Sequence, residues 1–494
     1  MGITLLSVAE LRAIERQAQA TLPAGTLMAR AGAAVGRCIA VSQSGMPLSV
    51  CVVAGPGNNG GDGYAAASEL RDAGHRITCV QLAKPVSDDA RTALTRWRSS
   101  GGTTRAELPT GQHFDVVVDA MLGIGQTRPL QGVLLAAAQW INAQRTHVVA
   151  IDVPSGLDVD RGCWLGGVEG VYASETITFI ADKPGLHTGD GVDAAGSVTV
   201  DRLELEPAST RTMLTDPSDF SQIVMPRRRN THKGSYGNAL IIGGAAGMVG
   251  AALLAARAAL TIGAGRVYVD CIGAPEFRVD PGQPELMFRP YATIEHLHSI
   301  VIGCGLGKSD AARRALQWAL DSDASLIIDA DALNLLSHGP ALSECVAARN
   351  ATTVLTPHPL EAARLLQVSV DDVQFDRITR ARELATRHRS IIVLKGAGSI
   401  AVHVNGRCAV NPTGGPALAT AGTGDVLAGL LGGLFAQHFD PWQATLAATW
   451  LHGRAGEGRD VGLTAGDIAK RVADELVRLR ATPHASESGL RPSH

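Results

Sequence analysis

Short apolar runs alternate with amphipathic segments along nearly the whole chain. Runs rich in Val and Ile are typical of strands that are buried on both faces of a parallel sheet. Such runs occupy residues 48–54, 75–83, 114–118, 147–151, 171–180 and 197–205, and later 239–242, 266–271, 299–302, 325–328, 352–355 and 391–394. Because helical segments separate these runs, the pattern predicts α/β domains built on parallel sheets.

The helical segments place apolar residues three and four positions apart, on one face of each helix. They cover residues 5–20, 27–40, 64–72, 425–437, 442–456 and 463–479, together with a segment that ends at Ile262. Ser7 is followed three residues later by Glu10, which predicts a capping box at the first helix. Residues 399–410 alternate apolar and polar positions around Asn405-Gly406, which predicts a β-hairpin.

Residues 207–221 lose this periodicity and are rich in Ser, Thr, Asp and Pro, so we interpret them as a linker. A length of 494 residues fits two large α/β domains or three of average size. We therefore expect one domain at residues 1–215 and a second at 222–480. The remainder of the chain, 481–494, lacks periodicity and is predicted to be a disordered tail.

The composition limits the classes of function. A net charge of −3 predicts no general affinity for nucleic acid or anionic membranes. Apolar runs are too short to cross a bilayer, and early charges argue against a secretory signal. Eight cysteines without CxxC or Cys/His spacing indicate neither a zinc site nor a disulfide framework. We expect a soluble, cytoplasmic protein with reduced thiols that acts on small molecules.

A glycine-rich stretch, GPGNNGGDG at 55–63, follows the strand at 48–54 and leads into a helix. Residues 55–60 match GxGxxG, so a dinucleotide-binding turn is one interpretation. That turn also requires an acidic residue at the end of the next strand to bind a ribose. The next strand ends near Gln81 and Lys84, which disfavours an ordinary dehydrogenase.

Two further strands of this half end in polar residues. Asp119 follows one of them, and Asp152 with Ser155 follows another. Because ligands collect at the carboxyl ends of parallel strands, we expect these residues to share a crevice with Asn59. Their oxygen atoms suit a hard cation or a polar substrate. Alternatively, both aspartates only accept hydrogen bonds from backbone N–H groups in turns.

The stretch NPTGGPALATAGTGDVLAGL at 411–430 carries the strongest signal in the second half. Glycines around residues 422–424 leave backbone N–H groups free to bind an anion, at the N-terminus of an apolar helix. Asp425 follows directly. It is either a cap or first-turn carboxylate, or a general base beside a phosphate.

Other polar residues of this half also gather at predicted strand ends. His358 lies between two prolines after one strand, and Asp329 and Asp331 follow another, which favours a site role for the histidine. Lys233 beside two glycines either holds a phosphate or belongs to a solvated basic surface. The GKS sequence ending at Ser309 lacks the first glycine of a P-loop, so it is not one.

These motifs together resemble a known family. HKGSYG at 232–237, DADALN at 329–334, TPHPLE at 356–361, VLKGAG at 393–398 and the stretch at 411–430 resemble ADP- or ATP-dependent NAD(P)H-hydrate dehydratases. GPGNNGGDGYAAA at 55–67 and DVPSGLD at 152–158 resemble NAD(P)H-hydrate epimerases. The order of the halves is that of the bifunctional NAD(P)H-hydrate repair enzymes. The resemblance implies a Rossmann-like α/β/α sandwich followed by a ribokinase-like α/β/α sandwich.

The resemblance also implies the site residues. In the epimerase half the substrate contacts are Asn58, Asn59, Gly60, Gly61, Asp62, Gly123, Ile124, Gly125, Gln126, Thr127, Arg128, Pro129 and Asp152, and K⁺ is bound by Asn59, Asp119 and Ser155. In the dehydratase half the hydrate contacts are Ala251, Gly305, His358 and Asp425, and the adenine nucleotide is bound by Lys395, Gly396, Ala397, Gly398, Ser399 and Gly424.

The expected chemistry is repair of a hydrated nicotinamide coenzyme. Asp152 would handle a proton during interconversion of the R and S hydrates of NADH and NADPH. Asp425 would act as the base while ADP or ATP, with Mg²⁺, phosphorylates the hydroxyl group of the S hydrate. We expect a homo-oligomer. The alternative is a ribokinase-like small-molecule kinase with a non-catalytic N-terminal binding domain.

Overall fold

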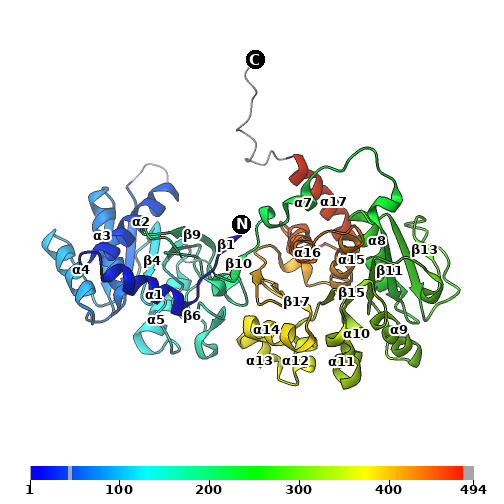
Figure 1. Ribbon diagram of the computed structural model, residues 1–494. Helices are drawn as coiled ribbons and strands as arrows, with labels where there is room; N and C mark the ends of the chain where they lie inside the picture. Colours follow the sequence, from blue (N-terminus) through cyan, green and yellow to red (C-terminus); the bar gives the residue numbers. More distant parts are fainter. Residues whose placement is uncertain (1, 43–46, 208–209, 482–494) are drawn as a thin grey trace, which may run out of the picture. The chain divides into compact units, whose positions relative to one another are not determined.

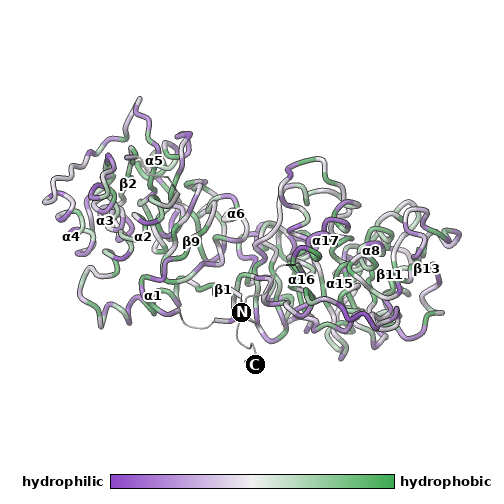
Figure 2. Tube along the Cα trace, turned by 90° about the horizontal axis from the view of Figure 1, so that it is seen from above, coloured by the Kyte–Doolittle hydropathy of each residue, from purple (hydrophilic) through white to green (hydrophobic). Residues whose placement is uncertain are grey.

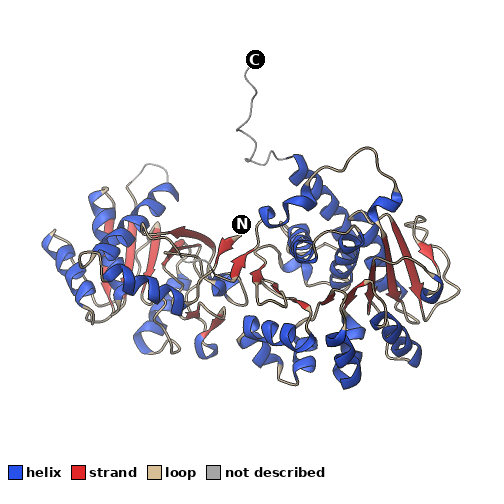
Figure 3. Cartoon of the chain, in the orientation of Figure 1, coloured by secondary structure: helices blue, strands red, loops and turns tan. Residues whose placement is uncertain are grey.

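A computed structural model describes residues 2–42, 47–207 and 210–481. The chain divides into two compact units, one covering Ile3–Met213 and the other formed mainly by the chain from Leu214 onward (Figure 1). Beyond residue 481, the predicted tail lies outside the described residues. Each unit is an α/β structure in which strands lie between helices (Figure 3), so the predicted fold class is confirmed.

The first unit contains a six-stranded sheet in the order β3-β2-β4-β5-β8-β9, and all its neighbouring strands are parallel. The strands of this sheet are β2 (Ser49–Ala54), β3 (Arg76–Gln81), β4 (Val116–Ala120), β5 (His147–Ile151), β8 (Glu175–Phe179) and β9 (Ser197–Asp201). The unit also contains three two-residue strands outside this sheet, β1 (Ile3–Thr4), β6 (Leu157–Asp158) and β7 (Cys163–Trp164). Its helices are α1 (Val8–Gln19), α2 (Thr26–Ser42), α3 (Asn58–Asp72), α4 (Asp88–Ser99), α5 (Gly132–Ala143) and α6 (Gly191–Ala194).

Side chains alternate across this sheet because successive strand residues point to opposite faces. Val50 and Val52 of β2 pack in a core with residues of α1, α2, α3 and α4. Cys51 and Val53 pack in a second core with residues of α5. The continuous apolar run of β2 is therefore explained by helices on both faces. At the start of α1, Ser7 and Glu10 form the predicted capping box.

The first glycine-rich stretch is mostly helical, and our prediction of a loop extending to Gly63 is wrong. Helix α3 begins at Asn58 rather than at Tyr64. Added Cβ atoms at Gly60, Gly61 and Gly63 would lie only 2.0, 2.4 and 2.5 Å from neighbouring atoms. These glycines permit close packing of the helix, which is a tertiary constraint that local patterns do not show.

Replacing Gly60 by alanine is expected to destabilise the first unit. Its Cβ atom would lie 2.0 Å from the carbonyl oxygen of Gly55, and backbone cannot move aside cheaply. We expect a loss of about 1–3 kcal/mol, measured from the urea dependence of hydrogen exchange in peptides of β2 and α3. The control is Gly57→Ala, whose Cβ would meet nothing within 4 Å. Equal stability of the two variants would contradict the packing argument.

Several strands are shorter than the predicted apolar runs, as in β8 (predicted at 171–180) and β9 (predicted at 197–205). The strand predicted at residues 114–118 is β4, which is displaced by two residues, so Asp119 lies inside the strand. The described part of the predicted linker contains β10 (Thr212–Leu214) and leads into α7 (Ser221–Val224). Residues 208–209 of that linker lie outside the described residues.

The second unit contains strands in the order β19-β18-β17-β16-β15-β14-β11-β12-β13. The strands are parallel from β17 to β13, and β17, β18 and β19 pair antiparallel, as the predicted hairpin requires. These strands are β11 (Asn238–Gly243), β12 (Arg266–Cys271), β13 (Met287–Phe288), β14 (Ser299–Ile302), β15 (Ser325–Ile328), β16 (Thr353–Leu355), β17 (Ile391–Leu394), β18 (Ile400–Val402) and β19 (Cys408–Val410).

Helices cover both faces of this sheet, with α9 to α14 on one face and α8, α15, α16 and α17 on the other (Figure 1). The helices are α8 (Val249–Thr261), α9 (Asp310–Leu320), α10 (Ala330–His338), α11 (Pro340–Ala348), α12 (Pro359–Leu366), α13 (Val370–Phe375), α14 (Arg377–His388), α15 (Thr423–Ala436), α16 (Pro441–Gly456) and α17 (Ala465–Ala481). Helix α15 is buried nearly throughout and largely hydrophobic, whereas α4 carries many hydrophilic residues (Figure 2). Glycines let α15 approach its neighbours, because a Cβ at Gly429 would lie 2.0 Å from the Ala255 carbonyl oxygen.

Candidate active sites

The first unit contains a cavity of about 440 Å³ at the carboxyl ends of its strands. It is lined by residues of α1, α2 and α3 and by loops that follow β2, β4, β5 and β8. The charged and amide-bearing residues in this lining include Arg12, Glu15, Asn59, Asp62, Asp89, Asp152 and Lys183. Of the four residues expected to share a crevice, Asn59 and Asp152 line this cavity, whereas Asp119 and Ser155 do not.

Asp119 and Ser155 contact each other and are fully buried. The Ser155 hydroxyl and backbone N–H donate hydrogen bonds of 2.7 and 2.8 Å to the two carboxylate oxygens of Asp119. Met121 N–H also donates to Asp119, and Leu122 N–H donates to the Ser155 hydroxyl. Burial raises the pKa of Asp119 to about 6. Two of these three donors to Asp119 are backbone N–H groups, which agrees with the alternative interpretation of this aspartate as a turn residue.

Asp152 lies at the cavity wall in an unusual backbone conformation, with φ of 68°. Its two carboxylate oxygens have different partners. Lys183 Nζ lies 3.0 Å from Oδ1, and Ile124 N–H donates a 3.2 Å hydrogen bond to Oδ2. Left-handed backbone at a residue other than glycine is costly and persists where the surroundings enforce it, which is common at functional sites.

Asn59 is buried, yet neither atom of its side-chain amide has a hydrogen-bond partner among the described residues. A Cβ at Gly123 would lie 3.5 Å from the Asn59 side chain and 3.1 Å from Asp152 Oδ2, so both residues border Gly123. Unpaired buried polar atoms need a ligand or water. Asn59 is therefore a candidate to contact a ligand in this cavity.

The sequence analysis missed Lys183, which is only 1% exposed. Besides Asp152, its ammonium group donates to Thr178 Oγ1 at 2.5 Å and to the carbonyl oxygens of Phe179 and Ala181. Lys183 follows β8, and the rule that polar residues gather after parallel strands could have found it.

The cavity lining contains only some of the substrate contacts that the resemblance implies. Those that line it are Asn58, Asn59, Asp62, Gly123, Ile124, Gly125, Gln126 and Asp152, whereas Gly60, Gly61, Thr127, Arg128 and Pro129 do not. Gly60 and Gly61 face other protein atoms. Gln126 donates to the carbonyl oxygen of Leu157 at 2.8 Å and accepts from Gly156 N–H at 2.7 Å, so it also holds the loop after β5.

In the second unit, Asp425 lies in the first turn of α15 and does not cap it. The N-cap is Gly422, with φ of 90°, and no side chain caps the helix. Burial raises the pKa of Asp425 to about 6, and the nearby negative charge of Asp329 adds to the effect. Asp425 is therefore a first-turn carboxylate and not the N-cap, and this position is compatible with a role as general base.

Asp329 and Lys395 form a buried ion pair beside this residue. Lys395 Nζ lies 2.7 Å from Asp329 Oδ1, which also accepts a 2.8 Å hydrogen bond from Thr356 Oγ1. A Cβ at Gly424 would lie 3.3 Å from Lys395 Nζ. The ammonium group is thus directed at the N-terminal turn of α15, where positive charge and backbone N–H groups together suit a phosphate.

His358 and Glu361 extend the same network. His358 Nε2 lies 3.2 Å from Glu361 Oε1, and its Nδ1 accepts hydrogen bonds from the N–H groups of Leu360 and Glu361. The other oxygen of Glu361 lies 4.0 Å from Lys395 Nζ. Burial raises the pKa of Glu361 to about 7 and lowers that of His358. The histidine is therefore neutral, with its proton on Nε2.

Gly305 and Ala251, two of the implied hydrate contacts, also lie together. A Cβ at Gly305 would lie 3.1 Å from the Ala251 Cβ atom, and Gly305 has φ of 59°. The adjacent Cys304 thiol is fully buried beside Asp425. By contrast, Lys233 is exposed, which favours its interpretation as part of a solvated surface.

Cys304, Asp329 and Asp425 each offer one ligand atom within 4.8 Å of the others. Burial raises the pKa of the Cys304 thiol well above its ordinary value, so the thiol stays protonated and is a poor ligand for a hard cation. Lys395 already neutralises Asp329. This cluster does not fit Mg²⁺, for which nucleotide phosphates are the natural ligands.

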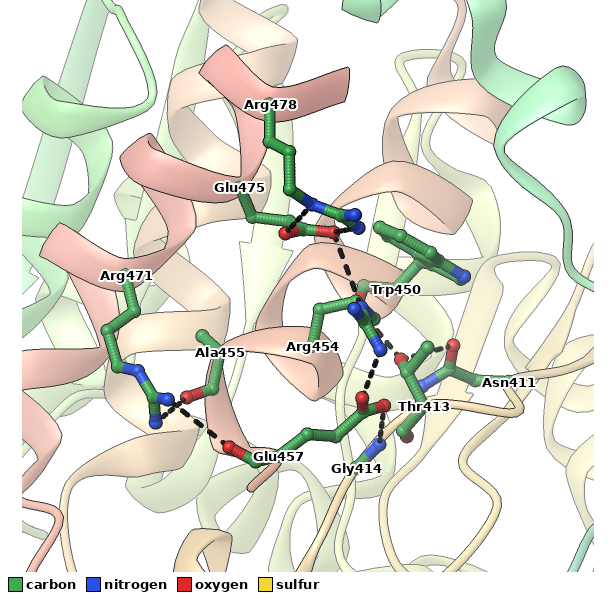
Figure 4. Close-up of polar contacts among 10 residues, drawn as sticks. All are labelled: Asn411, Thr413, Gly414, Trp450, Arg454, Ala455, Glu457, Arg471, Glu475 and Arg478. Carbon is green, nitrogen blue, oxygen red and sulfur yellow. Dashed lines mark hydrogen bonds and ion pairs between the residues drawn. The ribbon is translucent and has the colours of Figure 1, made fainter. Parts of the chain in front are cut away.

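A polar network holds the loop at residues 411–415 that precedes the glycine turn (Figure 4). Thr413 Oγ1 donates a 2.8 Å hydrogen bond to the carbonyl oxygen of Trp450, and Gly414 N–H donates to Glu457. Arg454 pairs with both Glu457 and Glu475. The C-terminal end of α16 therefore fixes the start of the stretch that leads to Asp425.

Two α/β/α units, one with a polar cavity and the other with an anion-binding turn beside a buried Asp–Lys pair, define a fused small-molecule enzyme. Comparisons with known proteins show the family to which the chain belongs. Residues 239–477 match the protein-family model described as NAD(P)H-hydrate dehydratase, and residues 24–185 match the model described as YjeF-related protein N-terminus. The chain belongs to the family of bifunctional NAD(P)H-hydrate repair enzymes, which confirms the resemblance.

Curated relatives match both halves of the chain. A bifunctional NAD(P)H-hydrate repair enzyme of Coxiella burnetii is 36% identical, over 93% of this chain and 96% of the relative. The corresponding enzyme of Escherichia coli is 34% identical, over 87% of this chain and 84% of the relative. A Bacillus subtilis ADP/ATP-dependent NAD(P)H-hydrate dehydratase, co-crystallised with ATP and Mg²⁺, is 30% identical with a TM-score of 0.47, and the match covers 54% of this chain and 99% of that protein.

Within the residues that the structure describes, no helix is both long and apolar enough to cross a bilayer.

Proposed function

We propose that the first unit interconverts the R and S forms of NAD(P)H hydrate and that the second unit dehydrates the S form at the expense of ADP or ATP. The observation that carries the proposal is the ion-pair network of His358, Glu361, Lys395 and Asp329, which ends within 4.8 Å of the Asp425 carboxylate. It joins the residues expected at the hydrate to the turn expected at the phosphate. Family membership of the whole chain supports both activities.

In the second unit, the hydrated nicotinamide ring carries a hydroxyl group on C6, and hydroxide is a poor leaving group. Asp425 accepts the proton of this hydroxyl as its oxygen attacks the terminal phosphorus of the nucleotide. The backbone N–H groups of Gly422 and Gly424 and the ammonium of Lys395 stabilise the charge on the transferred phosphoryl group. Phosphate then leaves C6, and loss of a proton from the adjacent carbon restores the dihydropyridine ring. Mg²⁺ bound to the nucleotide phosphates would neutralise their charge.

In the first unit, Asp152 is the proton-handling group at C6. Lys183 holds its carboxylate in place on one side, and Ile124 N–H does so on the other. A K⁺ ion held by Asn59, Asp119 and Ser155 would add positive charge beside the substrate. The position of Asp152 on the cavity wall supports its proposed role.

The direct test is absorbance at 340 nm after mixing R and S hydrate with the protein and each nucleotide in turn. Full conversion to NADH with ADP or ATP requires both activities. Conversion of only the S hydrate would contradict the proposed epimerase activity of the first unit. Accumulation of a stable phosphorylated compound without NADH would instead indicate a ribokinase-like kinase. Sedimentation analysis of the same sample would test the predicted homo-oligomer.

The dehydratase rate is expected to depend on the ionisation of Asp425. Because burial and the charge of Asp329 raise its pKa to about 6, kcat/KM for S hydrate should fall roughly tenfold per pH unit below that value, as the base becomes protonated. Asp329→Asn removes a negative charge and should shift this acidic limb to lower pH. Glu361→Gln should leave the limb in place. If Glu361→Gln shifts the acidic limb and Asp329→Asn does not, the assignment of this limb to Asp425 is wrong.

A further inference from the structure

Two aspartates on the wall of the first cavity have opposite surroundings. Asp152 forms an ion pair with Lys183 and accepts a hydrogen bond from Ile124 N–H. Asp62 also lines the cavity, yet its carboxyl group has no hydrogen bond or ion pair with any residue in the described part of the chain. Pairs of carboxyl groups in such different surroundings commonly divide into an acid and a base.

The charges around Asp62 oppose its ionisation. Burial raises its pKa well above the ordinary value, and the negative charges of Asp152, Glu15 and Asp89 add to this effect. The cavity also contains the cationic groups of Arg12 and Lys183. Lys183 is committed to Asp152, while the side chain of Arg12 is largely exposed. These surroundings favour the protonated, neutral form of the Asp62 carboxyl group.

The location of Asp62 relative to Asn59 supports contact with substrate. The two residues are three positions apart on α3, so they lie on the same face of the helix, and both line the cavity. The amide of Asn59 has both atoms unpaired among the described residues, as expected of a group that meets a ligand. The face of α3 that carries Asp62 is thus a substrate-facing surface.

We propose that Asp62 is the general acid of the epimerase reaction and that the reaction breaks the C6–O bond of the hydrate. Asp62 protonates the C6 hydroxyl group, which leaves as water with the bonding electron pair. The lone pair of N1 forms an N1=C6 iminium ion, and the carboxylates of Asp62 and Asp152 stabilise its positive charge. Water adds to the opposite face of C6 and gives its proton to Asp152. Solvent then returns a proton from Asp152 to Asp62, so no proton is gained or lost overall.

This inference rests on the proposed epimerase function and specifies its bond cleavage. The competing route opens the ring at the C6–N1 bond, gives an aldehyde, and closes the ring on the other face. That route starts with removal of the hydroxyl proton and retains the oxygen atom. The two routes therefore differ in the origin of the oxygen on the inverted hydrate.

The experiment uses the full-length protein without nucleotide, so that the hydrate is not consumed. Purified R hydrate is incubated in H₂¹⁸O and the reaction is stopped early. The S hydrate is then separated, and its ¹⁸O content is measured by mass spectrometry. The ¹⁸O content of a sample incubated without protein is subtracted. We expect one solvent oxygen in every S molecule formed. Retention of the original oxygen would overturn the proposal, while absence of any S hydrate would contradict the epimerase function itself.

Variants test the assignment of the acid. Asp62→Asn should lower kcat for R-to-S conversion about 10²- to 10³-fold with little change in KM, and Asp62→Glu should recover part of the rate. Asp72→Asn, on the same helix but exposed and paired with Arg71, is the matched control with unchanged activity. Dehydration of S hydrate by the same samples verifies folding of the chain. A wild-type rate for Asp62→Asn would refute the role of Asp62.

Discussion

Replacing Asp425 by asparagine is expected to lower kcat for S-hydrate dehydration by about 10²- to 10⁴-fold, because the carboxylate accepts the proton of the attacking hydroxyl group. Asparagine has nearly the same shape, so binding of hydrate and nucleotide should change little. The single-turnover rate of NADH formation at saturating S hydrate, followed at 340 nm, measures this loss. Equilibrium binding of the nucleotide measures what is retained.

The matched control for this variant is a nearby aspartate outside the proposed catalytic network. Asp331 also follows β15, but its carboxylate accepts a 2.8 Å hydrogen bond from Gly307 N–H and serves the loop rather than the reaction. Asp331→Asn should therefore retain most of the turnover. An Asp425→Asn variant that converts S hydrate at the normal rate would refute the role of Asp425. Conversion of R to S hydrate should be unchanged in both variants.

The second large effect is expected for Asp152. Asp152→Asn should lower R-to-S conversion by about 10²- to 10⁴-fold, so R hydrate accumulates while S hydrate is still repaired. Asparagine is the appropriate replacement because it tolerates the left-handed backbone at φ of 68°, whereas alanine would add strain. Chromatographic separation of the two hydrates during turnover measures the outcome.

Loss of the Asp152 charge also leaves Lys183 buried without its counter-ion, which alone can cost about 3–5 kcal/mol. The double variant Asp152→Asn/Lys183→Met removes both charges and separates the two effects. If Asp152 acts on the substrate, the double variant recovers stability but not R-to-S conversion. Loss of S-hydrate repair along with epimerisation would instead indicate that the whole chain had failed to fold.

Local sequence patterns predicted most of the secondary structure, because strand burial and turn formation each require particular residues at neighbouring positions. The bounds of β12, β14, β15 and β17 match those expected from apolar runs, and Asn405-Gly406 connects the predicted hairpin strands. The start of α3 could not be predicted in this way. Its glycines are required by close contacts with Gly55, Met28 and Ala120, all of which lie outside the helix. A glycine-rich sequence is otherwise typical of a loop, so local patterns suggested one here.

In the candidate sites, too, some residues could be predicted from local sequence and others could not. Strand-end residues such as Asp152 and His358 could be found because parallel strands deliver their carboxyl ends to one edge of the sheet. Their partners could not be found from spacing. Lys183 reaches Asp152 from a segment 31 positions later in the chain, and Lys395 reaches Asp329 across 66 positions. Such pairs are decided by which strands are neighbours.

The sequence by itself determined the α/β class, the family and the residue types available at the strand ends, because these depend on local periodicity and on motifs of adjacent residues. Only the tertiary structure decided the charge states. Whether a carboxyl group is an acid or a base depends on burial and on the nearest opposite charge, as the contrast between Asp62 and Asp152 shows. Those neighbours come from elements that the chain brings together only when it folds.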